Sequence, residues 1–73
     1  MATDKRAKKR ELEDLLMTMG LHRMDQTAYR GKGDTAGVAR SEQLLEFDYA
    51  AIREHCAEHG LALPLDVPPE DAA

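Results

Sequence analysis

Apolar side chains recur every three or four positions in the first part of the chain, the spacing that places them on one face of a helix. This stripe consists of Leu12, Leu15, Leu16 and Met19. Thr3 or Asp4 can cap the start of the helix, and Gly20 suits the left-handed residue that commonly follows a helix end. The pattern therefore predicts a first helix that ends at Gly20.

A second stripe at helical spacing lies nearer the C-terminus. It consists of Tyr49, Ile52, Cys56 and His59. Asp48 is a suitable N-cap for this helix, and Gly60 suits its C-terminal end. Ser41 is in turn a suitable N-cap for a short helix over residues 42–47.

The stretch between these stripes, residues 21–40, fits no single pattern. Strand-favouring residues such as Tyr29 stand there among polar ones. Gly31 and Gly33 predict a turn, because glycine adopts positive φ without strain. Gly37 disfavours a stable helix directly after that turn.

Two folds therefore stay open. Residues 42–47 are either helical or a strand that pairs with residues 24–30 across the glycine turn. We favour the helix and expect a mainly α, small single domain of two to three helices. A short β-hairpin, which would give an α+β domain, is the alternative.

The chain changes character after Gly60. Residues 61–67 are apolar and contain a proline, which predicts an extended segment lying over the core. Residues 68–73 combine prolines with acids, a composition typical of a disordered acidic tail. We expect three parts: a flexible basic arm over residues 1–10 that merges into the first helix, a globular domain over residues 11–67, and the tail over residues 68–73.

The size of the chain narrows the function. With 73 residues it supports only a small core, which leaves little room for a deep, dry active site. We therefore expect no enzyme and no cofactor. The single Cys56 excludes an intramolecular disulfide and a Cys-rich zinc module, and it is compatible with a reducing cytoplasm. The chain has neither the long apolar run of a membrane span nor the apolar region of a secretory signal.

Charge is distributed unevenly along the chain. Residues 1–10 hold five cations and one acid, whereas residues 42–73 hold eight acids and one cation. A molecule with this polarity orients in the field of a charged partner. The candidate contact residues are the cations of the N-terminal arm and, secondarily, two cations at the glycine turn: Lys5, Arg6, Lys8, Lys9, Arg10, Arg30 and Lys32.

Three groups of residues match chemical sites only in part. His55 and His59 flank Cys56, yet structural zinc usually takes two ligands from each of two separated clusters, so we expect no metal site. Cys56 lies on the apolar stripe, where a thiol is usually an inert core residue. The glycine turn lacks the spacing of a phosphate-binding loop, so we interpret it as a plain turn.

Binding of a macromolecule is the function class that remains. The basic arm can contact phosphates without sequence preference, although the chain as a whole is acidic and has few aromatic residues for base stacking. Met17, Met19 and Met24 lie close together, and methionine adapts its shape at binding surfaces. We expect Met19 in the core and a monomer that binds a protein partner.

The basic opening and the ending from Gly60 to the tail give the chain a recognisable organisation. The opening reads Met1-Ala2-Thr3-Asp4-Lys5-Arg6-Ala7-Lys8-Lys9-Arg10. In size and organisation the chain resembles the small RNA polymerase-binding transcription regulators encoded by phages of Xanthomonas. Proteins of that kind bind the host polymerase, hinder promoter-dependent initiation by displacing the sigma factor, and let elongating polymerase read through terminators. The resemblance implies a non-enzymatic regulator that binds bacterial RNA polymerase in the cytoplasm of the host cell.

Two other classes stay open. A small DNA-associated regulator, either antitoxin-like or of the helix-turn-helix type, would dimerise and bind duplex DNA selectively at physiological salt. An enzyme built on Cys56 and its flanking histidines would show rapid labelling of that thiol in the folded protein.

Overall fold

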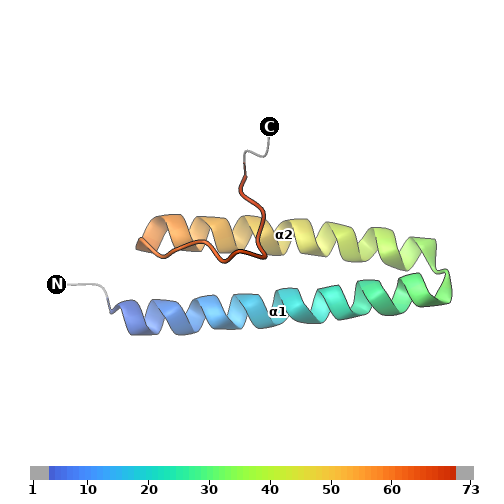
Figure 1. Cartoon of the computed structure of the whole chain (residues 1–73), viewed down its shortest axis with the longest axis horizontal. Coiled ribbons are helices and arrows are strands. Elements are labelled where there is room, and N and C mark those ends of the chain that lie inside the picture. Colours follow the sequence, from blue (N-terminus) through green and yellow to red (C-terminus); the bar gives the residue numbers. More distant parts are fainter. Residues whose placement is uncertain (1–3, 71–73) are drawn as a thin grey trace.

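The computed structural model describes residues 4–70 of the chain. Two long helices, α1 (Lys5–Lys32) and α2 (Thr35–His59), run antiparallel to each other and are joined by a tight turn. The segment after α2 then folds back along the hairpin (Figure 1). The molecule is a flat rod with extents of 51 × 28 × 16 Å.

Both helices have well-defined ends. The carboxylate of Asp4 accepts a hydrogen bond from the amide of Arg6 at 3.0 Å, and that of Asp34 accepts one from the amide of Gly37 at 2.9 Å. The helices end at Gly33 (φ +71°) and Gly60 (φ +65°), both left-handed, where a residue without a Cβ is unstrained. The predicted cap at Asp4, the predicted end at Gly60 and the turn at Gly33 are therefore confirmed, whereas Gly31 lies inside α1.

The predicted end of the first helix at Gly20 is wrong. Helix α1 continues for twelve residues beyond it, to Lys32. Glycine in a helix interior costs about 1 kcal/mol relative to alanine. That cost is small beside the burial of Met19 and the pairing of His22 and Arg23 with α2.

The predicted starts at Ser41 and Asp48 are also wrong, because both residues lie inside α2. The hydroxyl of Ser41 donates a hydrogen bond to the carbonyl of Gly37 at 2.9 Å, so it is satisfied within the helix. The carboxylate of Asp48 lies against His22 of α1 and caps nothing. Helix α2 therefore begins at Thr35 and includes Gly37.

The predicted fold class, a small, mainly α domain of two to three helices, is confirmed with two helices. Residues 4–70 contain no strand, so the alternative β-hairpin is wrong. Neither helix combines the length and the apolar character needed to cross a membrane. Residues 5–10 of the expected arm form the first turns of α1, whereas residues 1–3 of the arm, with the cap candidate Thr3, and residues 71–73 of the expected tail lie outside the described part of the chain.

The core is small and lies mainly in the half of the hairpin nearer the chain termini. Met19 of α1 packs with three residues of α2 and with Val67 of the C-terminal segment. The buried hydrophobic residues are Met19, Leu45, Ile52, Cys56 and Val67. Leu61 and Leu63 pack against this cluster, which confirms that residues 61–67 lie over the core.

Candidate functional site

Two stretches of three residues, one in each helix, lie opposite each other in the hairpin. In α1 the triplet is Leu21-His22-Arg23, and in α2 it is Phe47-Asp48-Tyr49. The middle residues meet between the helices, where Nδ1 of His22 lies 2.5 Å from Oδ2 of Asp48. The last residues meet on one face, where Arg23 donates a hydrogen bond to the hydroxyl of Tyr49 at 3.2 Å.

The face that carries Arg23 and Tyr49 is covered by the C-terminal segment. Arg23 donates to the carboxylate of Asp66 at 3.1 Å and to the carbonyl of Asp66 at 2.5 Å. Its guanidinium also lies over the ring of Tyr49, 5.6 Å from the ring centre. The hydrogen bond to Tyr49, with a smaller contribution from Asp66, raises the pKa of Arg23 and keeps it charged. Arg23 thus fastens the segment to both helices.

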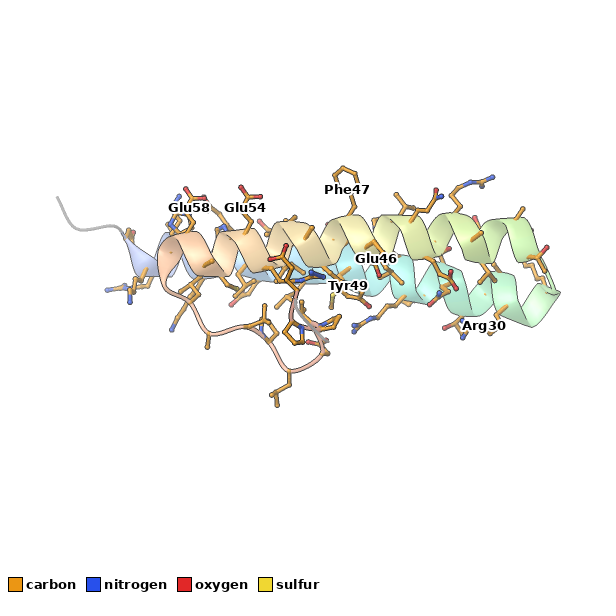
Figure 2. The ribbon with its side chains drawn as sticks, turned by 90° about the horizontal axis from the view of Figure 1, so that it is seen from above. Arg30, Glu46, Phe47, Tyr49, Glu54 and Glu58 are labelled. Carbon is orange, nitrogen blue, oxygen red and sulfur yellow. The ribbon has the colours of Figure 1, made fainter. Side chains whose placement is uncertain are left out.

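The first residues of the two triplets point to the opposite face. Successive helical residues are rotated by about 100°, so Leu21 and Phe47 lie on the far side of His22 and Asp48 from the C-terminal segment. Figure 2 shows Phe47 projecting away from the side on which that segment lies. Its side chain is 79% exposed.

Five large apolar side chains are exposed on this uncovered side, two of them toward the outer edge of α1, and we call the set the apolar face. Three follow one stripe of α1 at four- and three-residue spacing, and two stand three residues apart in α2. They are Met17, Leu21, Met24, Leu44 and Phe47, each between 42% and 79% exposed. Large apolar residues exposed along two neighbouring helix stripes mark an interaction surface more often than residues scattered singly do.

Charged residues bound the apolar face along α2. Glu54 and Glu58 continue the stripe of Phe47 toward the end of α2 and point to the same side (Figure 2). Arg40, two turns before Phe47, continues the stripe toward the turn. A partner on this face therefore meets an apolar centre with acids at one end and a cation at the other.

The cations singled out in the sequence fall into two separate groups. Lys5, Arg6, Lys9 and Arg10 are exposed in the first turns of α1, which we call the basic end. Lys8 is half-buried and forms an ion pair with Glu11 at 3.4 Å.

Arg30 and Lys32 lie in the last turn of α1, about 30 Å from the basic end at the 1.5 Å rise per helical residue. Figure 2 shows Arg30 pointing away from the side of Phe47. One compact partner surface of modest size therefore does not contact the two groups together.

A cluster of potential metal ligands lies beside the basic end. Glu11 of α1 meets His55 and His59 of α2, and their ligand atoms lie within 4.8 Å of one another. The two imidazole rings are in edge contact, with centroids 4.7 Å apart. Cys56, which stands between them in the sequence, points elsewhere and donates a long hydrogen bond to the carbonyl of Ala62 at 3.8 Å.

The thiol of Cys56 belongs to the core. It is 3% exposed, and burial raises its pKa, so the reactive thiolate is disfavoured. This agrees with the interpretation of Cys56 as a core residue.

Sequence reasoning missed Leu21, Leu44 and Phe47. Met17, Leu21 and Met24 form a stripe only if the helix runs through Gly20, and Leu44 and Phe47 join them only if the two helices pair antiparallel with His22 opposite Asp48. The available signal was the uninterrupted helical spacing of apolar residues from 17 to 24.

The chain matches no protein-family model, no curated protein and no solved structure.

Proposed function

We propose that the protein is a non-enzymatic regulator that docks its apolar face on a protein partner, and that this partner is bacterial RNA polymerase. The observation that supports docking is the asymmetry of the hairpin. The chain covers one face with its own C-terminal segment and leaves Met17, Leu21, Met24, Leu44 and Phe47 in solvent on the other. The identity of the partner rests on the resemblance given by the basic opening and the chain ending.

Burial of the apolar face supplies the affinity in this proposal. A large apolar side chain contributes about 1.5–3 kcal/mol when it is fully removed from water. Phe47 is the most exposed member of the face, so it has the most to gain from a partner. Aromatic residues at the centre of an interface commonly dominate its binding energy.

The basic end supplies a second, salt-dependent contact. Lys5, Arg6, Lys9 and Arg10 reach solvent at one end of the rod, beside the acids that bound the apolar face. In a complex with polymerase they contact an acidic protein surface or nucleic acid phosphates, which steers association. Inhibition of initiation and readthrough at terminators are the consequences that we propose for this complex.

The alternative of a helix-turn-helix DNA-binding protein gains no support from the described residues. Its two helices would cross at about 90–120°, whereas α1 and α2 lie antiparallel along their full length (Figure 1). The exposed stripe of α2 also carries Glu54 and Glu58, which repel phosphates.

The first test is binding to purified bacterial RNA polymerase on a sensor surface. Phe47→Asp places a charge on the apolar face at its most exposed residue and should weaken binding by about tenfold or more. Leu65→Asp is the matched control, because Leu65 is a fully exposed apolar residue on the segment that covers the opposite face. It should bind like the wild type. Circular dichroism of each variant checks that the hairpin is folded.

Three outcomes separate the parts of the proposal. No binding of the wild type would refute polymerase as the partner. Equal weakening by Phe47→Asp and Leu65→Asp would refute the apolar face as the docking surface. Alanine at all five cations from Lys5 to Arg10 should flatten the salt dependence of binding, and an unchanged salt slope would refute the basic end as a contact.

A transcription assay tests the consequence of binding. Promoter-dependent initiation should fall, and readthrough of a terminator should rise, when the wild-type protein is added to purified polymerase. The Phe47→Asp variant should do neither at the same concentration. A protein that binds polymerase and changes neither step would refute the proposed regulatory role.

A further inference from the structure

The open end of the hairpin brings together three metal-ligating side chains from both helices. Glu11 is in the second turn of α1, and His55 and His59 stand one turn apart near the end of α2. The two histidine side chains are only 12% and 17% exposed, whereas the carboxylate of Glu11 reaches solvent. The ligand atoms all lie within 4.8 Å of one another, which is close enough for one ion to contact all three after small side-chain rotations.

We propose that Glu11, His55 and His59 form a binding site for a divalent transition metal of the zinc class. Imidazole nitrogens suit zinc and its neighbours, and a carboxylate adds negative charge to balance the ion. Two histidines four residues apart on one helix share a face, so both can reach the same ion. Three protein ligands leave a further position for water or for a group of a bound partner.

A second observation concerns the orientation of His55. Its Nε2 lies 2.8 Å from the backbone carbonyl of Lys8, a bond that links the ring to the first turns of α1. The same Nε2 lies 3.9 Å from Oε2 of Glu11, so an ion held between these two atoms has to replace the hydrogen bond to Lys8. The side chain of Lys8 lies 3.4 Å from the carboxylate of Glu11. The ammonium of Lys8 therefore competes with any metal ion for the carboxylate of Glu11.

The competing ammonium gives the proposal a specific consequence. A bound metal ion has to displace Lys8 from Glu11, and the pair is partly exposed, so the lysine can swing into solvent. An ion in this position joins α1 to α2 close to the basic end. Metal binding should therefore stabilise the folded chain and fix the open end of the hairpin.

The test is titration of the untagged protein with Zn²⁺ alone, followed by calorimetry and by the midpoint of thermal unfolding. His59→Ala removes one ligand and should weaken binding by about a hundredfold, and Glu11→Gln should weaken it by about tenfold or more. Glu13→Gln is the matched control, because Glu13 is an exposed acid of α1 outside the cluster. Lys8→Met removes the competing cation and should tighten binding.

The outcomes decide the proposal even if one variant folds poorly. Glu11 is exposed, so Glu11→Gln keeps the fold and reports on the ligand alone. Binding that is equal in the wild type, His59→Ala and Glu11→Gln would overturn the site, as would no binding of Zn²⁺ to the wild type at about 100 µM. Binding retained through His22 would appear as affinity that survives in His59→Ala, and this too would overturn the proposal.

Discussion

The ring of Tyr29 in α1 lies directly against Gly37 in α2. A Cβ at position 37 would fall 2.5 Å from both Cγ and Cδ1 of that ring, and 3.0 Å from a carboxylate oxygen of Asp34. A distance of 2.5 Å is too short for nonbonded carbon atoms, so the absence of a side chain at Gly37 allows the helices to approach at the turn. Glycine is needed here for space, because Gly37 has no positive φ.

Replacement of Gly37 by alanine should therefore destabilise the protein. We expect Gly37→Ala to lower the free energy of unfolding by about 1–3 kcal/mol through overpacking against Tyr29. Gly20→Ala is the control, since nothing lies within 4 Å of a Cβ there, and it should raise the free energy of unfolding by about 0.5–1 kcal/mol. Urea denaturation followed by circular dichroism measures both. Stabilisation by both substitutions would contradict the close approach.

Loss of Arg23 should free the C-terminal segment from the helices. Arg23→Ala removes three hydrogen bonds, to Tyr49 and to two acceptors of Asp66. We expect it to cost about 1–2 kcal/mol and to increase the rate at which Cys56 reacts with an alkylating reagent. Arg23→Lys keeps the charge but lacks the planar fork of donors. Its stability and its labelling rate should therefore lie between those of the wild type and those of Arg23→Ala. Identical labelling rates in all three proteins would argue against this role of Arg23.

The thiol of Cys56 should make stability depend on pH in the alkaline range. Burial raises its pKa, so the folded chain keeps the thiol proton where the unfolded chain has released it. The free energy of unfolding therefore falls as pH rises above about 8.5, the ordinary thiol value. Cys56→Ala should lack this part of the fall. The check is thermal unfolding of both proteins from pH 7 to pH 10, and parallel curves would show that burial of the thiol has no such effect.

The apolar face and the core should respond differently to truncation. Ile52 is fully buried, and Ile52→Ala should cost about 2–5 kcal/mol. Phe47→Ser should change the free energy of unfolding by less than about 0.5 kcal/mol, because Phe47 already lies in solvent. Chemical denaturation compares the two. A large loss of stability in Phe47→Ser would mean that the ring supports the fold and is not held ready for a partner.

The start of the first helix and the end of the last were more predictable from the sequence than the structure between them. Asp4 and Gly60 act locally, through a side-chain cap and a left-handed backbone, so their roles follow from residue type. Gly20, Ser41 and Asp48 carry the same local signals, yet all three are interior to a helix. At these three positions, contacts between the two helices determine whether the helix continues, and residue type alone does not reveal those contacts.

The candidate site was predictable only in part, for the same reason. The exposure of Lys5, Arg6, Lys9 and Arg10 follows from their charge and position. The apolar face depends on the pairing of residues about 26 positions apart, as in His22 with Asp48. The metal-ligand cluster required Glu11, which is 44 positions from His55 and carries no signal of its own in the sequence.

The uneven distribution of the core has a mechanical consequence. Between residues 26 and 43 the only buried residues are Gly37 and Ser41, both small. The half of the hairpin near the turn therefore has few apolar contacts to break, and low local stability follows from such sparse packing. Met24 and Leu44 stand just outside this stretch, so the apolar face lies beside the better packed half of the hairpin. We therefore expect the amide hydrogens of the turn half to exchange with solvent before those of the half under the C-terminal segment, while the apolar face stays folded.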